Sequence, residues 1–318
     1  MSDSLTANKL TIKNRLLYFL KNQGKIVLFI IFLFIFYAFR FPSGAAADTI
    51  IGEELIYTVQ QSDNLYLISA KLGVSVDRLI KDNNIDLKKI LRVGQKLRAN
   101  TMKIVPYKID DGIIINIPDR MLYFFQKGAL KTAFPVGLGM PSWRGKTQWR
   151  TPTGKFEVVS KRKNPTWHVP LSMQRKMALE GEPVKTVVPP GPDNPLGRYA
   201  INTTIPGIVI HETIWPESVY RYRSHGCIRV IPQNMEVFFY MVEIKTVGEI
   251  IYNPVKIAVT NDFRIYLEVH KDIYGYKKDL MREAKALIGD RGVSHLVDWN
   301  KIERVVGEQA GIVEDITL

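Results

Sequence analysis

The sequence contains very little cysteine, because Cys227 is the only one in 318 residues. A single cysteine cannot close an intramolecular disulfide bond, so a small domain stapled by disulfides is excluded. The chain is 46% hydrophobic and 24% charged. This balance excludes a disordered chain and a collagen-like fibre, and it leaves ample material for a buried core. No segment repeats at a fixed period.

Acidic residues are also in short supply, since 31 Asp and Glu stand against 44 Lys and Arg, for a net charge of +13. Such a charge suits a polyanionic partner: nucleic acid, a membrane face or an acidic polymer of the cell envelope. Nucleic acid is disfavoured, because the sequence has no zinc-finger spacing and no basic run interleaved with aromatic residues. The length exceeds what one ordinary domain needs and predicts two or three modules.

The first 47 residues have the pattern of an export signal. Residues 1–25 are basic and polar, an apolar run extends from Ile26 to Phe39, and Ala45–Ala47 form an A-x-A site. The apolar run is shorter than the roughly 20 residues that a spanning helix needs, which favours a secretory signal cleaved before Asp48. An uncleaved membrane anchor is the alternative. Under either interpretation residues 48–318 lie in the periplasm, and they keep a net charge of +8.

Residues 55–100 show the order strand, helix, helix, strand. The runs at 55–59 and 91–97 are typical of strands, while apolar residues at helical spacing over 65–72 and 76–84 predict two short helices. Polar residues at 62–64 suit a helix start, and Gly73 suits a helix end.

This segment resembles the lysin motif (LysM) family. The matching residues are Tyr57-Thr58-Val59, Asp63-Asn64-Leu65, Ile68-Ser69, Gly73-Val74-Ser75-Val76, Leu79, Asn83-Asn84 and Leu91-Arg92-Val93-Gly94-Gln95-Lys96-Leu97. The family usually has Gly-Asp-Ser/Thr-Leu where this chain has Ser62-Asp63-Asn64-Leu65. The resemblance implies binding to the glycan strands of peptidoglycan. A small packing domain without a ligand is the alternative.

The rest of the chain is expected to be a strand-rich region followed by a smaller part with helices. The expected strands lie at 113–117, 121–125, 156–160, 208–210 and 249–252. Residues 101–110 are expected to be a linker, and residues 160–198 a long irregular functional loop. After residue 253 we expect a strand pair and then two helices, whose apolar stripes at 280–288 and 299–306 are interpreted as core.

Cys227 has chemically distinctive neighbours. His211 ends a predicted strand, and twelve residues separate it from the run Ser224-His225-Gly226-Cys227-Ile228-Arg229. A thiol nucleophile needs a base and donors for the oxyanion; His211 supplies the base, and the N–H groups of Gly226 and Cys227 are candidate donors. Arginines at 221, 223 and 229 are expected to lower the thiol pKa from about 8.5 towards neutrality. An inert buried cysteine is the alternative.

Other catalytic patterns fail on the sequence. Trp215 stands where the zinc-protease pattern H-E-x-x-H needs its second histidine. One cysteine with the scattered His168, His270 and His295 gives no zinc-ligand spacing. Ser224 is not flanked as in the G-x-S-x-G turn of serine hydrolases.

The stretch from His211 to Arg229 closely resembles the L,D-transpeptidase catalytic domain, whose pattern is a His, about a dozen residues, Ser/Thr-His-Gly-Cys, and Arg or Asn shortly after. The likeness covers about residues 110–256. Supporting matches are Thr151–Phe156, Asn164–Pro170, Pro189–Pro192, Asn194–Tyr199, and, as in envelope members from Gram-negative bacteria, Pro254–Lys256 and Tyr266–His270. The family usually has Gly where this chain has Glu212, whose carboxylate is expected either to orient the imidazole or to point outward. A role of this carboxylate in substrate choice is a further alternative.

The resemblance implies that Cys227 attacks the carbonyl carbon at the L-centre of a diamino acid in a tetrapeptide stem. D-Ala leaves, and an amine resolves the thioester: another stem, a lysine of an envelope lipoprotein, or a free D-amino acid. In this interpretation His211 is the base, the Gly226 and Cys227 amides are the oxyanion donors, and Ser224 and His225 orient His211 and the loop.

Further residues are assigned to substrate binding. Arg229 is expected to hold the loop or meet a substrate carboxylate, with a structural salt bridge as the alternative. Trp167 and Tyr199 are expected to line the groove, with buried packing as the alternative. Thr213 is grouped with these substrate-binding residues.

We therefore expect an α+β multidomain protein: a signal or anchor at 1–47, a LysM βααβ module at 54–100, a mainly-β catalytic sandwich at 110–256, and a small helical tail with strands at 257–318. No cofactor and no metal are implied. The expected partners are peptidoglycan and an envelope lipoprotein, not nucleic acid. Two alternatives stay open: a hydrolase that uses the same cysteine with water as acceptor, and a non-catalytic wall-binding protein.

Overall fold

The computed structural model describes residues 48–142, 144–145, 149–277 and 279–318. The chain divides into two units, Met1–Ala46 and Ala47–Leu318, and all described residues belong to the second. The expected signal segment lies outside the described residues. Among the helices that are described, none combines the length and the apolar character needed to cross a membrane.

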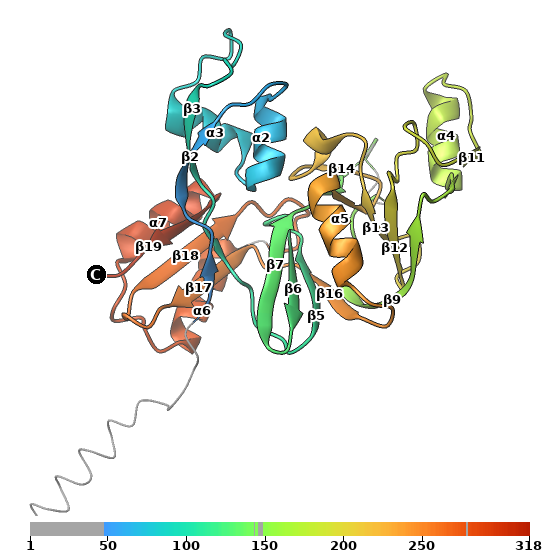
Figure 1. Ribbon diagram of the computed structural model, residues 1–318. Coiled ribbons are helices and arrows are strands. Elements are labelled where there is room, and N and C mark those ends of the chain that lie inside the picture. Colours follow the sequence, from blue (N-terminus) through green and yellow to red (C-terminus); the bar gives the residue numbers. More distant parts are fainter. Residues whose placement is uncertain (1–47, 143, 146–148, 278) are drawn as a thin grey trace, which may run out of the picture. The chain divides into compact units, whose positions relative to one another are not determined.

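The first module has the expected order strand, helix, helix, strand (Figure 1). It consists of β2 (Glu54–Thr58), α2 (Leu65–Leu72), α3 (Val76–Asn83) and β3 (Lys96–Asn100), with β2 antiparallel to β3. Local signals set the ends of α2: the Asn64 side chain accepts the N–H of Leu67, and Gly73 ends the helix with a φ of 65°.

The last strand of this module starts later than expected. The predicted strand at 91–97 is wrong over its first half, because β3 begins only at Lys96. The preceding residues form a turn: Gly94 has a φ of 84°, which favours glycine. Its N–H donates to the carbonyl oxygen of Val59, so the turn is tied to the end of β2.

The expected linker at 101–110 is partly built into the fold, so that prediction is wrong. β4 (Lys103–Ile104) pairs antiparallel with β1 (Ile50–Ile51). Ile104 packs against Ala258 and Val313 of the C-terminal part. An apolar residue with long-range neighbours stabilises the segment, and the local sequence does not reveal those neighbours.

An eight-stranded mixed sheet forms the strand-rich region. Its order is β15 (Ile228–Val230), β13 (Val209–Glu212), β12 (Tyr199–Thr203), β9 (Gly154–Lys163), β16 (Val247–Ile251), β5 (Gly112–Asn116), β6 (Met121–Gln126) and β7 (Ala129–Pro135). The pairs β13–β15 and β16–β5 are parallel, and the others are antiparallel. Helix α5 (Pro232–Met241) packs Met235 and Phe238 into the core beside Ile210 and Ile228.

Shorter elements lie around this sheet. β8 (Leu138–Gly139) pairs parallel with β14 (Tyr222–Ser224), and the 3₁₀ helix η1 (Pro216–Ser218) precedes β14. The expected irregular loop at 160–198 instead contains β10 (Trp167–His168), β11 (Val187–Val188) and helix α4 (Leu171–Leu179). No residue of α4 is buried, so no apolar stripe marks the helix in the sequence.

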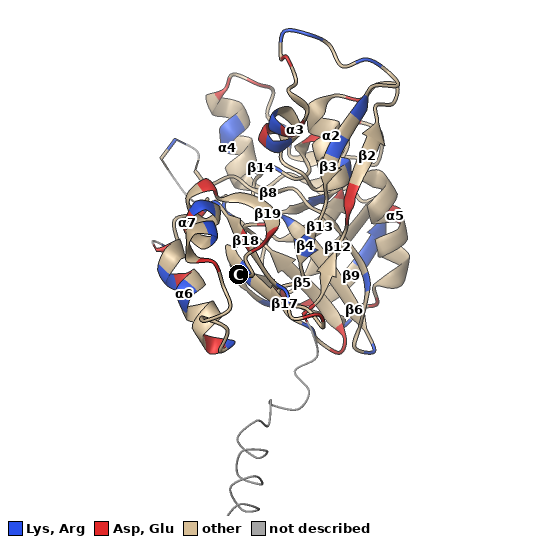
Figure 2. Cartoon of the chain, turned by 90° about the vertical axis from the view of Figure 1, so that its left-hand side faces the viewer, with Lys and Arg blue, Asp and Glu red and all other residues tan. Residues whose placement is uncertain are grey.

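The C-terminal part is an antiparallel sheet with two helices. β17 (Val255–Val259), β18 (Ile265–His270) and β19 (Ala310–Asp315) form the sheet, and α6 (Leu280–Asp290) and α7 (Trp299–Glu308) supply buried side chains to its core. The expected strand pair and both helices are confirmed, whereas β19 was not foreseen. Figure 2 shows basic and acidic residues interspersed along the ribbon of α6 and α7. The fold is the expected α+β type; the domain divisions stay predictions.

Candidate active site

Two neighbouring parallel strands bring the predicted base and nucleophile to one face of the sheet. In the register of β13 and β15, Ile210 lies beside Ile228 and His211 beside Arg229. Successive side chains of a strand point to opposite faces. Ile210 and Ile228 point into the core, so His211 and Arg229 point to the other face, and Cys227 shares that face as the second residue before Arg229.

His211 is held as a neutral base. Its Nδ1 atom lies 2.6 Å from the carbonyl oxygen of Glu212. A carbonyl oxygen can only accept, so Nδ1 carries the proton and Nε2 keeps its lone pair. Burial, and to a smaller extent the nearby charge of Arg229, together lower the pKa of His211 to about 4, although the hydrogen bond to Glu212 acts in the opposite direction.

The thiol of Cys227 is held in its protonated form. It donates to the carbonyl oxygen of Gly207, with 3.3 Å between sulfur and oxygen, and no hydrogen bond joins it to the described ring of His211. Burial raises the pKa of the Cys227 thiol above its ordinary value, although the N–H of Val209 and the charge of Arg229 act against this. The expectation of a lowered thiol pKa is therefore wrong.

The three arginines do not act together on the thiol. Arg229 alone among them lowers the pKa of Cys227. The guanidinium of Arg221 lies over the ring of Tyr66, 4.1 Å from its centre, and Arg223 is exposed. All three arginines are close to Cys227 in the sequence. In the fold, the side chains of Arg221 and Arg223 point away from the thiol.

A tight turn from Ser224 to Cys227 fixes the nucleophile. The Ser224 hydroxyl donates to the carbonyl oxygen of Cys227 at 2.5 Å and accepts the N–H of Gly226 at 3.2 Å. Gly226 has a φ of 110°, which side chains other than glycine rarely adopt. The Gly226 N–H is engaged by the Ser224 hydroxyl in this arrangement, so its expected role as an oxyanion donor stays a prediction. The N–H of Cys227 has no acceptor among the described residues and remains the candidate donor.

His225 does not orient His211, contrary to expectation. Its ring packs edge-on against Trp149, with 4.2 Å between the ring centres. The Nε2 atom of His225 is buried and has no hydrogen-bond partner among the described residues. Burial lowers the pKa of His225 to about 4, helped by the charges of Arg229 and Lys176. The backbone carbonyl of Glu212 takes the orienting role, and no sequence pattern could have indicated it.

The carboxylate of Glu212 neither orients the imidazole nor points outward. It is buried and pairs with the Nε atom of Arg198, 3.1 Å from one carboxylate oxygen. Gly197 makes room for it, because a Cβ atom at residue 197 would lie 2.7 Å from that of Glu212. The expectations that it orients the imidazole or points outward are therefore wrong, and its effect on substrate choice stays a prediction.

Arg229 keeps a fixed backbone and an unpaired charge. Its N–H and C=O both bond to Gly137, at 2.8 Å each. The guanidinium lies 5.5 Å from the ring centre of Trp215 and forms no ion pair with a described carboxylate. A structural salt bridge is thus not its role, and a cation beside the thiol is free to meet an anionic group.

The other predicted substrate residues lie in different settings. Thr213 is fully buried and its hydroxyl accepts the N–H of Trp215, so it has no access to a ligand. Tyr199 packs on Phe239 of α5, on the face opposite His211. Both predicted contacts are wrong, and packing explains each residue. Trp167 is partly exposed on β10, and its role stays a prediction.

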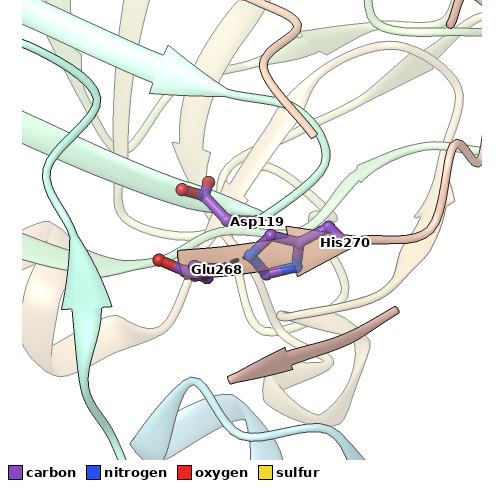
Figure 3. A group of neighbouring side chains, drawn as sticks. All are labelled: Asp119, Glu268 and His270. Atoms are coloured by element: carbon purple, nitrogen blue, oxygen red, sulfur yellow. Dashed lines mark hydrogen bonds and ion pairs between the residues drawn. The ribbon is translucent and has the colours of Figure 1, made fainter. Parts of the chain in front are cut away.

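One group of potential metal ligands lies away from this site. Asp119, Glu268 and His270 are buried with ligand atoms within 4.8 Å of one another (Figure 3). The ammonium of Lys256 lies 2.7 Å from Asp119 and 2.9 Å from Glu268. A cation therefore already occupies the space between the two carboxylates, and the group is a charge network rather than a metal site.

Comparisons with known proteins match two parts of the chain to known families. Residues 110–257 match the model of the L,D-transpeptidase catalytic domain, YkuD, and residues 57–100 match that of the LysM domain. The chain is 27% identical over 239 residues to the probable L,D-transpeptidase YbiS of Escherichia coli, covering 74% of this chain and 76% of that protein.

Two further similarities involve a longer alignment and a solved structure. The chain is 25% identical over 290 residues to the probable L,D-transpeptidase ErfK/SrfK of Salmonella typhimurium, covering 88% of this chain and 92% of that one. The catalytic domain of an Enterococcus faecium L,D-transpeptidase is similar with a TM-score of 0.34 and 22% identity, over 45% of this chain and 98% of the other. A score this low adds no argument of its own.

Proposed function

We propose that this chain, which belongs to the L,D-transpeptidase family and carries a LysM domain ahead of its catalytic domain, uses Cys227 as an acyl-transfer nucleophile on peptidoglycan stem peptides. The observation that carries the proposal is the strand register that puts His211 beside Arg229, two residues after Cys227, so that a partly exposed thiol and a neutral imidazole share one face of the sheet. A nucleophile with a nearby base is the minimum that this chemistry needs.

The first half of the reaction is acylation. As the Cys227 sulfur bonds to the carbonyl carbon at the L-centre of the stem, its proton passes to Nε2 of His211. The N–H of Cys227 donates to the oxyanion that develops. The bond to D-Ala then breaks, and the imidazolium returns its proton to the departing amine, which leaves a thioester on Cys227.

The second half transfers the acyl group. An amine attacks the thioester carbon, His211 Nε2 takes the proton from the amine, and the sulfur leaves and regains a proton from the imidazolium. The raised pKa of Cys227 and the lowered pKa of His211 favour a neutral thiol and a neutral imidazole at rest. The proton therefore moves during attack and does not form an ion pair beforehand.

Arg229 is suited to bind a carboxylate of the stem. Its unpaired guanidinium lies on the same face as Cys227, and the ring of Trp215 lies beside it. A guanidinium binds a carboxylate through two parallel hydrogen bonds, which gives orientation as well as affinity. The sequence analysis gave the same carboxylate-binding role for Arg229. Thr213 and Tyr199, which were grouped with it, pack inside the fold instead.

The LysM domain is proposed to bind glycan strands of the same polymer, in the periplasm. The domain is joined to the catalytic region through α2, whose Tyr66 stacks on Arg221 and whose Ala70 packs with Val219 and Ile231. Binding to glycan would thus keep the catalytic site near its stems.

Analysis of muropeptides after incubation of the protein with sacculi or isolated tetrapeptide muropeptides tests the proposal. Release of D-Ala together with new cross-links or exchanged D-amino acids supports transfer, and attachment of an added lipoprotein lysine identifies that acceptor. Net loss of cross-links supports the hydrolytic alternative. A matched Cys227→Ala protein that changes the muropeptides as the wild type does would contradict the proposal.

A further inference from the structure

A chain of hydrogen bonds links the C-terminal part of the protein to the nucleophile. Tyr274 follows β18, beyond the residues that match the catalytic domain, which end at 257. Its hydroxyl accepts the N–H of Thr151 at 3.1 Å and donates to the carbonyl oxygen of Gly139 at 2.6 Å. The Thr151 hydroxyl in turn accepts the N–H of Gly139 and donates to the carbonyl oxygen of Gly226, both at 2.9 Å.

The hydrogen bond from the Thr151 hydroxyl to the carbonyl oxygen of Gly226 fixes the orientation of a peptide group that matters for catalysis. The carbonyl of Gly226 and the N–H of Cys227 belong to one planar peptide unit and point in opposite directions. When Thr151 holds the carbonyl, it also sets the direction of the Cys227 N–H, which is the candidate oxyanion donor.

We propose that Thr151 and Tyr274 are positioning residues that hold the Gly226–Cys227 peptide in the orientation that stabilises the oxyanion. This proposal rests on the proposed function. It makes the C-terminal part a functional component of the active site, through one phenol hydroxyl that the matched catalytic domain does not contain.

The geometry around Tyr274 is suited to this role. Thr151 and Tyr274 are buried, so water does not compete for their hydrogen bonds. The N–H of Tyr274 donates to the Tyr252 hydroxyl at 2.8 Å, which donates to Asp272 at 2.6 Å. The guanidinium of Arg150 donates to the carbonyl oxygen of Tyr274 at 2.7 Å. The backbone of Tyr274 is thus held at both its N–H and its carbonyl oxygen, which limits how far the ring and its hydroxyl can move.

Four variants of the full chain test the proposal. Tyr274→Phe removes only the hydroxyl. Thr151→Val removes the hydroxyl but keeps the shape, whereas Thr151→Ser keeps the hydroxyl. Tyr276→Phe is the matched control, because the ring of Tyr276 belongs to the same aromatic cluster and its hydroxyl forms no hydrogen bond with a described residue. For each we would measure kcat and KM for D-Ala release, and Tm.

Loss of one oxyanion donor lowers kcat by about 10² to 10³, so misdirecting it is expected to cost about tenfold or more. We expect Tyr274→Phe and Thr151→Val to lower kcat to this extent with KM little changed, Thr151→Ser to recover activity relative to Thr151→Val, and Tyr276→Phe to match the wild type.

Wild-type kcat in both Tyr274→Phe and Thr151→Val would overturn the proposal. The proposal would also be overturned if the fall in kcat of both variants matched the fraction of protein that is unfolded. A Thr151→Ser protein with a kcat no higher than that of Thr151→Val would overturn it as well. A wild-type protein that releases no D-Ala and forms no covalent adduct with a carbapenem would overturn the proposed function itself. An active wild type with unaffected variants would overturn only the positioning role.

Discussion

The imidazole of His211 donates its Nδ1 proton to the carbonyl oxygen of Glu212 across 2.6 Å. This bond leaves Nε2 as the acceptor on the face of the sheet that also carries Cys227. The orienting partner is a backbone atom, so the base does not depend on an acidic side chain of the kind that completes many catalytic triads.

The first prediction concerns the acid side of the pH profile. Burial and the charge of Arg229 lower the pKa of His211 from 6.5 to about 4, so the neutral base persists as the pH falls through 6 and 5. The rate of carbapenem adduct formation should therefore decline only as the pH approaches about 4. A decline centred near the ordinary histidine value of 6.5 would contradict the assignment.

The second prediction concerns the free thiol. Burial raises the pKa of the Cys227 thiol above its ordinary value, and alkylation requires the thiolate. The rate of alkylation by iodoacetamide should be low at pH 7 and should still be rising above pH 9. Cys227→Ala is the blank, since the chain has no other cysteine. A rate that is already constant at pH 7 would show a preformed thiolate.

The third prediction uses Arg229 to link these two titrations. Its positive charge disfavours the imidazolium of His211 and favours the thiolate of Cys227. Removing the charge should therefore raise both pKa values, and Arg229→Gln should move both pH profiles to higher pH. KM for the stem should also increase if the guanidinium binds a carboxylate.

The exposed Arg223 supplies the control for that variant, because it affects neither pKa. Arg223→Gln should leave both profiles in place. Equal shifts in the two variants would point to a general effect of net charge and not to the position of Arg229.

The fourth prediction concerns the buried charge network in Figure 3. Lys256 lies between Asp119 and Glu268, and its ammonium also donates to the carbonyl oxygen of Ile104. Lys256→Met would leave two buried carboxylates without their cation, which typically costs about 3–5 kcal/mol. Urea unfolding of the full chain measures the loss.

An exposed ion pair in the same part of the protein provides the comparison. Arg264 pairs with Asp315, and more than half of its side chain is accessible. Arg264→Met should cost at most about 1 kcal/mol. A similar loss in both variants would mean that the buried network contributes no more than a surface pair.

Local signals predicted a large part of the fold. In the LysM module, Asn64 and Gly73 are the helix ends that their side-chain chemistry favours. The apolar stripes of α6 and α7 likewise correspond to buried faces. The motif around Cys227 also predicts the nucleophile and the base without knowledge of the fold.

The parts of the fold and of the site that the sequence does not predict depend on contacts between residues far apart in the sequence. Helix α4 buries no side chain and so has no apolar stripe, and β4 is a strand because of β1, about fifty residues earlier. The Arg198 partner of Glu212 and the Tyr274 partner of Thr151 are also distant in sequence. No local pattern encodes such pairs, so the roles of Thr213, Tyr199 and His225 were assigned from proximity to the motif and were wrong.

The most direct measurement is the intact mass of the protein after incubation with a carbapenem, followed by peptide mapping. The wild type should gain the mass of one carbapenem on the peptide that contains Cys227, and a folded Cys227→Ala protein should gain none. A folded wild type that stays unmodified, or an adduct on another residue that persists in Cys227→Ala, would contradict the assignment of Cys227 as the nucleophile.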